Sequence, residues 1–164
     1  MNWKKYIDNI PNFPKEGIIY RDIQPILENR FIFSSVINEL KNLINIKPDY
    51  WVGVESRGFI FASAIAHKNG DGFKMIRKRG KLPNENLAMK RYELEYGSDW
   101  IEMKRGKGDV IIVDDVYATG GTMSAAEQLC IEAGYNVVGK ICLVDIGLVK
   151  DHNVRCLITY NEQE

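Results

Sequence analysis

The chain has 164 residues, of which 45% are hydrophobic and 27% are charged, the profile of a globular protein with one domain and one core. Lys plus Arg and Asp plus Glu number 22 each, so no net charge attracts a nucleic acid. No apolar run is long enough to span a bilayer, and no apolar region follows the first lysines. We therefore expect a cytoplasmic protein with no nucleic-acid partner and no membrane partner.

The first half of the chain predicts helices and strands in alternation. Apolar residues at helical spacing predict a helix over residues 33–44, and a short apolar run predicts a strand over residues 50–54. Residues 59–68 are rich in Ala and Ile, which favours a second helix, and residues 73–77 return as a strand. Residues 78–91 are polar and contain Pro and Gly, so we expect an exposed loop there. Loops of this length in compact domains are commonly functional.

The second half continues the alternation. Residues 110–113 form a continuous apolar run, typical of a strand buried on both faces of a parallel sheet. An apolar face over residues 123–133 predicts a helix, and Gly134 stands where a left-handed residue would end it. Residues 136–145 are strand-like again. The alternation predicts an α/β domain with a mostly parallel sheet, whose ligands bind at the carboxyl ends of the strands.

Residues 110–122 read VIIVDDVYATGGT and join the central strand to the next helix. Free amides and the positive end of the helix dipole favour a phosphate at such a junction, and Gly120 and Gly121 permit close backbone approach. Asp114 and Asp115 would repel that anion but accept well from paired hydroxyl donors, such as those of a sugar. The motif therefore indicates a sugar phosphate. The alternative is a strand that ends in two solvated aspartates before an ordinary glycine turn.

Other chemistry-bearing residues argue against several classes of protein. The Lys of a Walker A loop and a Gly-x-Gly-x-x-Gly sequence before a helix are both missing, so neither an NTPase nor a Rossmann dehydrogenase is indicated. Cys130, Cys142 and Cys156 lie in apolar stretches without metal-ligand spacing, which predicts buried free thiols. His67 and His152 are far apart in the sequence, so a histidine-based metal site is not expected.

The motif at residues 110–122 resembles the phosphoribosyl pyrophosphate (PRPP) binding signature of the type I phosphoribosyltransferases. Further blocks carry the likeness in the family's order: IPNFPKEGIIYRDIQPIL, VGVESRGFIF, and RKRGKLP with YELEYG. Over nearly its full length the chain is similar to the adenine phosphoribosyltransferase family. The resemblance implies one domain over residues 1–164 with a mostly parallel central sheet flanked by helices. It also implies a small N-terminal hood at about residues 1–28 and a flexible loop at about residues 78–97.

Members of this family transfer ribose 5-phosphate from PRPP to N9 of adenine in purine salvage, giving AMP and pyrophosphate. The resemblance implies the same activity here, in a homodimer, with Mg2+ carried by PRPP and no direct protein ligands to the metal. Two rival functions stay open, namely a phosphoribosyltransferase for another purine base and a catalytically inactive regulator that senses PRPP. The intact basic block and YELEYG argue against the regulator, as does the lack of room for a DNA-binding domain.

The resemblance also assigns catalytic roles. Arg57 in ESRGF would hold pyrophosphate bidentately, although an ordinary surface turn explains the same pattern. The family often has a cis peptide in this loop, and the bond expected to be cis is Glu55–Ser56. Residues 92–96 alternate like a half-exposed strand, and that interpretation can coexist with a functional one. Glu95 would reach the base nitrogens when the loop closes and excludes water from an oxocarbenium-like ribosyl centre. The implied catalytic residues are Glu95, Arg57, Asp114 and Asp115.

The remaining roles concern substrate binding. Tyr20 would stack on the purine while backbone groups near Ile19 and Arg21 read its edge, unless Tyr20 only packs the hood. The basic cluster would approach the pyrophosphate, partly from a neighbouring subunit, although a solvated basic loop is the default explanation. The implied substrate-binding residues are Ile19, Tyr20, Arg21, Glu55, Ser56, Arg77, Lys78, Lys81, Tyr96, Ala118, Thr119, Gly120, Gly121 and Thr122.

Overall fold

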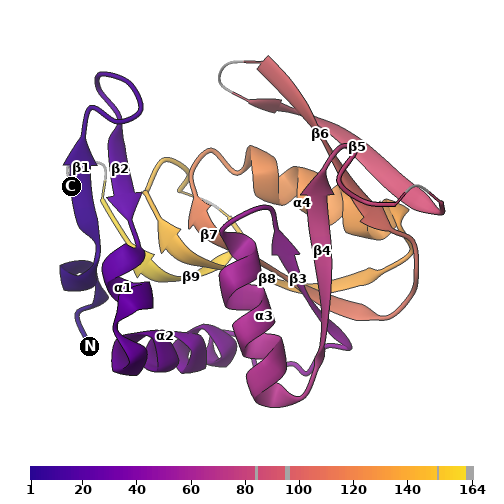
Figure 1. Cartoon of the computed structure of the whole chain (residues 1–164), viewed down its shortest axis with the longest axis horizontal. Coiled ribbons are helices and arrows are strands. Elements are labelled where there is room, and N and C mark those ends of the chain that lie inside the picture. Colours follow the sequence, from indigo (N-terminus) through magenta and orange to yellow (C-terminus); the bar gives the residue numbers. More distant parts are fainter. Residues whose placement is uncertain (84, 95–96, 151, 162–164) are drawn as a thin grey trace. The chain divides into compact units, whose positions relative to one another are not determined.

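The computed structural model describes residues 1–83, 85–94, 97–150 and 152–161, in two compact units, Met1–Glu39 and Leu40–Glu164 (Figure 1). The first unit holds the 3-10 helix η1 (Trp3–Tyr6), the antiparallel strands β1 (Asp8–Pro11) and β2 (Ile19–Asp22), and helix α1 (Gln24–Glu28). Helix α2 (Arg30–Asn42) begins in this unit and ends in the second.

Short polar side chains accept hydrogen bonds from amides in the first turns of α1 and α2. The Oδ1 atom of Asp22 accepts a hydrogen bond from the amide of Gln24 at 3.0 Å, at the beginning of α1. The Oδ1 atom of Asn29 accepts from the amides of Phe31 and Ile32 at 3.1 and 3.2 Å, at the beginning of α2. Such bonds satisfy amides that have no partner inside the helix. The helix predicted over residues 33–44 is confirmed, and it starts earlier because Asn29 caps it.

The second unit is built around a seven-stranded sheet in the order β5-β6-β4-β3-β7-β8-β9. The neighbouring strands β4, β3, β7, β8 and β9 are all parallel to one another, whereas β6 runs antiparallel to both β4 and β5. This mostly parallel sheet with flanking helices confirms the predicted fold class. Its elements are β3 (Tyr50–Val54), α3 (Gly58–Asn69), β4 (Gly72–Lys78), β5 (Leu87–Leu94), β6 (Gly97–Lys104), β7 (Asp109–Tyr117), α4 (Gly121–Glu132), β8 (Asn136–Asp145) and β9 (Arg155–Thr159).

The helices α3 and α4 cover opposite faces of this sheet. Alternate residues of β3, Val52 and Val54, are buried in one hydrophobic core with Leu129 of α4. Gly53 lies between them and faces the other side, where a Cβ atom would come within 3.0 Å of Phe59 in α3. Because successive side chains of a strand point to opposite faces, each helix buries its own half of the sheet.

The chain reverses its direction across the sheet between β3 and β7. The connection through α3 leads from β3 to β4 on one side, and the connection through α4 leads from β7 to β8 on the other. Such a switch point leaves room between the two loops that follow its strands, and α/β proteins bind ligands there. The fold thus predicts a site beyond Val54 and Tyr117, where β3 and β7 end.

The exposed loop predicted over residues 78–91 is wrong in its second part. Leu87–Leu94 forms strand β5, which pairs with β6 along its whole length. The prediction followed the polar composition of this segment, but Ala88 is 1% exposed and packs in the same core as α4. Lys90 forms an ion pair with Glu132 of α4 at 2.7 Å, so a charged side chain also packs against the helix.

No helix in the described part of the chain has both the length and the apolar character needed to cross a membrane.

Candidate active site

Two loops meet at the switch point of the sheet. The parallel ladder between β3 and β7 ends at the pair Gly53 and Val113, so the segments that follow leave from neighbouring positions. Gly58 starts α3 beside β7, where a Cβ atom would lie 2.7 Å from the carbonyl oxygen of Val113 and 3.1 Å from Oδ1 of Asp114. Only glycine permits this approach, which brings the ESRG turn against the two aspartates.

Asp114 and Asp115 are buried, with exposed fractions of 8% and 6%. Oδ2 of Asp115 lies 2.7 Å from Nε of Arg57, so an ion pair joins the two loops. Oδ1 of Asp114 accepts a hydrogen bond from the amide of Asp115 at 2.9 Å. Burial, and then the charge of Asp115, raises the pKa of Asp114 well above its ordinary value. Burial also raises the pKa of Asp115, against the opposing effect of Arg57.

These two carboxylates are held where ionisation is unfavourable, a feature that occurs often at functional sites. A ligand that brings hydrogen-bond donors, such as paired sugar hydroxyls, would relieve the loss of hydration. The structure therefore places the predicted catalytic residues Arg57, Asp114 and Asp115 together.

The loop Ala118–Gly120 leads directly into α4, which begins at Gly121. Gly120 has φ of 82°, a conformation that glycine adopts without strain. The N-cap residue of α4 is Gly120, which has no side chain to cap the first amides of the helix. Thr119 is exposed, and Ala118 and Gly120 to Thr122 are half-buried. The free amides and the helix dipole therefore suit an anion, as the sequence predicts.

Glu55 and Arg77 connect the ESRG turn to the end of β4. The carboxylate of Glu55 accepts from the amide of Lys78 at 2.8 Å and from Nε of Arg77 at 3.3 Å. Burial alone would raise the pKa of Glu55, but these donors outweigh it and lower that pKa. Arg77 also donates to the carbonyl oxygen of Lys81 at 3.3 Å. The peptide bond between Glu55 and Ser56 is cis, which confirms the expected bond.

The predicted base-binding residues lie on β2 in the first unit. Ile19 is 46% exposed, whereas Arg21 is buried and donates from an Nη atom to Oδ1 of Asn9 at 2.6 Å. Tyr20 is half-buried and contacts the ring of Phe13 edge-on, with centroids 5.2 Å apart. Two further predicted residues, Glu95 and Tyr96, fall outside the described residues.

Comparisons with known proteins decide the family. Residues 20–155 match the phosphoribosyl transferase domain family. The adenine phosphoribosyltransferase of Hydrogenovibrio crunogenus is 52% identical over 147 residues, covering 87% of this chain and 84% of that protein. Its counterpart in Bdellovibrio bacteriovorus is 45% identical and covers 100% of this chain and 96% of that protein. The chain belongs to the adenine phosphoribosyltransferase family.

A solved phosphoribosyltransferase supports the fold as well as the family. The adenine phosphoribosyltransferase of Saccharomyces cerevisiae, in complex with D-2,5-dideoxy-2,5-imino-altritol 1,6-bisphosphate and adenine, is 36% identical to this chain. The alignment covers 94% of each chain with a TM-score of 0.85. The family resemblance and the fold inferred from the sequence are therefore confirmed.

The side chains of this chain that could bind a metal ion determine how Mg2+ would be held. Among the described residues, no three His, Cys, Asp or Glu side chains gather in a way that could hold a metal ion. The carboxylates of Asp115 and Glu55 already pair with Arg57 and Arg77. In proteins a Mg2+ ion is commonly bound through one or two carboxylates together with substrate phosphates.

Sequence reasoning missed one support of the loop Ala118–Gly120. A Cβ atom at Gly120 would lie 2.6 Å from the hydroxyl of Tyr117, so the tyrosine covers this glycine. The Tyr117 ring packs against His152, with centroids 4.4 Å apart, and Nε2 of His152 lies 3.1 Å from Oδ2 of Asp145. Burial, and then the charge of Asp145, raises the pKa of Tyr117. Only Tyr117 lies within the motif, so the sequence carried no signal for its distant partners.

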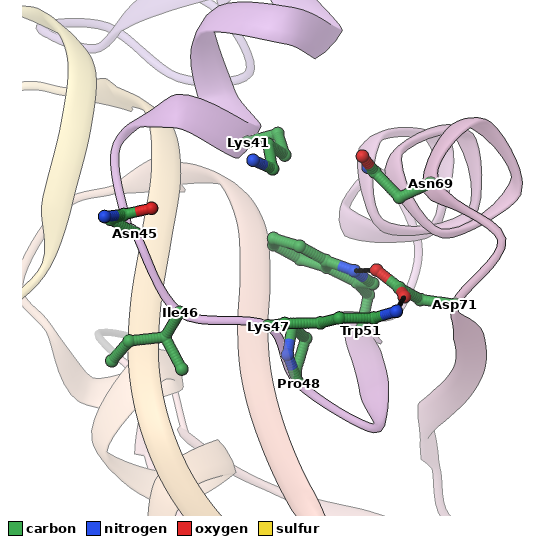
Figure 2. Close-up of a pocket in the computed structure, with 8 residues that line it drawn as sticks. All are labelled: Lys41, Asn45, Ile46, Lys47, Pro48, Trp51, Asn69 and Asp71. Carbon is green, nitrogen blue, oxygen red and sulfur yellow. Dashed lines mark hydrogen bonds and ion pairs between the residues drawn. The ribbon is translucent and has the colours of Figure 1, made fainter.

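A cavity of about 400 Å3 lies near the amino-terminal ends of β3 and β4, whereas the candidate active site lies beyond the carboxyl ends of β3 and β7 (Figure 2). Trp51 lies near the beginning of β3, and its Nε1 donates at 2.9 Å to Oδ2 of Asp71, just before β4. Nζ of Lys47 lies 3.8 Å from the other oxygen of Asp71. The eight residues drawn in Figure 2 include none that the sequence assigned to substrates. The cavity therefore lies apart from the candidate active site of the phosphoribosyltransferase.

Proposed function

We propose that this chain transfers the 5-phosphoribosyl group of PRPP to N9 of adenine, giving AMP and pyrophosphate in purine salvage. The observation that carries the proposal is the ion pair of Arg57 and Asp115, which joins two loops at the switch point of a phosphoribosyltransferase fold. In the reaction, the bond from ribose C1 to pyrophosphate breaks, the bond from C1 to N9 forms, and adenine loses its N9 proton.

Asp114 and Asp115 hold the ribose hydroxyls in this proposal. Support comes from their burial and raised pKa values, because two hydroxyl donors would stabilise the ionised carboxylates. The hydroxyl donors favour the negatively charged form of the two carboxylates, which then lies close to the ribosyl centre. This negative charge would favour the cationic transition state over the neutral substrate.

The 5-phosphate binds at residues Ala118 to Thr122. The support is the start of α4, where the N-cap residue Gly120 is left-handed and brings no capping side chain. Amides and hydroxyls at this junction fix one end of the sugar. A fixed phosphate and a fixed ribose hold C1 in place, so most of the catalytic effect here is positioning.

Pyrophosphate binds to Arg57, the Glu55–Ser56 turn and the basic cluster of Arg77, Lys78 and Lys81. Arg57 has 33% of its side chain accessible, so part of this side chain faces solvent beside its ion pair with Asp115. The positive charges stabilise the leaving group as it separates.

In this proposal Ile19, Tyr20 and Arg21 bind the base, and Glu95 and Tyr96 also take part in binding it. The exposed Ile19 and the aromatic pair of Tyr20 with Phe13 support an apolar surface for a purine. Glu95 takes part in moving a base proton. These residues carry the choice of adenine over other purines.

Three further properties belong to the same proposal. Mg2+ enters with PRPP and neutralises part of its pyrophosphate charge. The protein works as a homodimer in the cytoplasm, and residues 1–164 act as one domain with a hood at about residues 1–28. The segment at about residues 78–97 closes over the bound substrates.

The test is pyrophosphate release from PRPP and Mg2+ with adenine, guanine, hypoxanthine or no base. We expect release with adenine alone. Release with another base would keep the mechanism and overturn the named substrate. Tight PRPP binding without release under any condition would make the protein a PRPP-sensing regulator.

A further inference from the structure

Glu102 is a buried carboxylate that no part of the proposed reaction uses. It lies on β6, is 2% exposed, and pairs in register with Arg77 of β4. Its carboxylate accepts hydrogen bonds from three consecutive amides, those of Gly80 at 3.1 Å, Lys81 at 2.9 Å and Leu82 at 2.7 Å. A buried charge requires such donors, because its hydration is lost on folding.

The three amides belong to the turn that carries the basic cluster. The amide of Arg79 donates to the carbonyl oxygen of Trp100, and that of Lys81 donates to Lys78, at 3.0 and 3.3 Å. Gly80 has φ of 80° and occupies the turn position that favours glycine. The segment after β4 therefore bends back over Glu102, and the carboxylate fixes three successive peptide units.

The same segment is bound from the other side through Arg77. This arginine donates to the carbonyl oxygen of Lys81 at 3.3 Å and to Glu55 in the ESRG turn at 3.3 Å. Glu102 thus determines the path of the chain at Lys81, and Arg77 connects that path to the loop of Arg57. The side chain of Lys81 stays exposed.

We propose that Glu102 is a positioning residue for pyrophosphate, which holds residues 80–82 in their binding shape before PRPP arrives. The inference rests on the proposed function, because it takes Lys81 to be a pyrophosphate ligand. A segment that is ordered in advance loses less conformational freedom on binding, so the affinity for the ligand rises. Without Glu102 the fraction of molecules in the competent shape falls, and apparent affinity falls with it.

The test compares Glu102→Gln with the matched control Glu132→Gln. Glutamine offers one carbonyl oxygen to three amides, whereas Glu132 is an exposed partner of Lys90 on α4. We expect Glu102→Gln to raise KM for PRPP about tenfold, while KM for adenine stays unchanged. Amide hydrogen exchange at residues 80–82 should become faster, with no change in the strands. Glu132→Gln should leave both measurements as in the wild type.

Each outcome decides the inference separately from the proposed function. Equal changes in both KM values, or unchanged KM and exchange, would overturn the positioning role. If the wild type releases no pyrophosphate with any base, the proposed function fails, and unchanged exchange at residues 80–82 would overturn the inference as well. If Glu102→Gln does not fold, Gly80→Ala takes its place, because its Cβ atom meets open space while its φ is strained. An unchanged KM for PRPP in that variant would overturn the proposal.

Discussion

Two pairs of carboxylates near the carboxyl ends of the strands differ in the donors around them, although Asp115 pairs with Arg57 as Glu55 pairs with Arg77. Glu55 and Glu102 accept hydrogen bonds from backbone amides of residues 78–82, and Arg77 adds a guanidinium to Glu55. Asp114 and Asp115 are buried at the end of β7, and the pKa of each is raised. The pKa of Glu55 is lowered because its donors outweigh its burial.

This difference distinguishes carboxylates that stabilise a loop from carboxylates that could bind a ligand. A carboxylate that is well supplied with donors stabilises the loop that provides them. A buried carboxylate whose pKa stays raised is under-supplied, and a ligand can bring the missing donors. Glu55 and Glu102 thus hold the basic segment, which is consistent with the proposal that Asp114 and Asp115 bind the ribose hydroxyls.

The largest effect is expected from Asp115→Asn. The substitution keeps the size of the side chain but removes the charge that faces Arg57, so the cationic transition state loses stabilisation. We expect kcat/KM for PRPP to fall about a hundredfold or more, with the fold preserved. Steady-state kinetics and circular dichroism measure the two quantities. Unchanged turnover would contradict the role of Asp115 as a ribose ligand.

Asp114→Asn should raise stability while it lowers activity. Since the folded-state pKa of Asp114 is raised, the folded protein binds more protons than the unfolded chain, and the free energy of unfolding falls as pH rises above about 4. The variant has no carboxyl group at this position to ionise, so its free energy of unfolding does not fall in this way. Its melting temperature should exceed that of the wild type at neutral pH by roughly a few degrees. Thermal melts without ligand between pH 5 and 8 check the sign. A lower melting temperature throughout would contradict it.

Glu55→Gln should change stability in the opposite direction. The folded-state pKa of Glu55 is lowered, so its contribution is present above its unfolded pKa and is lost as pH falls through the folded value. The variant should therefore melt below the wild type at neutral pH, and the difference should shrink below about pH 4. A difference of constant size through acid pH would show that the charge of Glu55 contributes nothing.

The smallest effect is expected at the three thiols, which lie on α4, β8 and β9. Burial raises the pKa of Cys130 to about 12. Burial is also the main cause that raises the pKa of Cys142 well above its ordinary value. Cys156 is half-buried, so the predicted burial of all three thiols holds for two. A thiol reagent at pH 8 should modify at most Cys156 in the folded chain, with little change in activity. Rapid reaction of every thiol would contradict the packing.

Local patterns in the sequence predicted the central strands and the position of Asp114 and Asp115, because buried parallel strands are continuous apolar runs. The burial of Glu102 could not be predicted, since Ile101 and Met103 on either side are buried too and the alternation of a strand is lost. Its donors come from a distant turn. The first part of strand β5 was hidden by its polar composition, because Ala88 packs in a core with distant residues and Lys90 pairs with Glu132 of α4. The roles of Glu95 and of the hood stay predictions.

The most direct test of the proposal that Asp114 and Asp115 bind the ribose hydroxyls is calorimetry. It measures the binding of ribose 5-phosphate and 2-deoxyribose 5-phosphate to the wild type and to Asp115→Asn. The two ligands share the phosphate and differ by one hydroxyl. The wild type should bind ribose 5-phosphate about tenfold more tightly, and this preference should vanish in Asp115→Asn while binding of the deoxy sugar stays similar. Equal affinities in the wild type, or a preference that survives the substitution, would contradict the account.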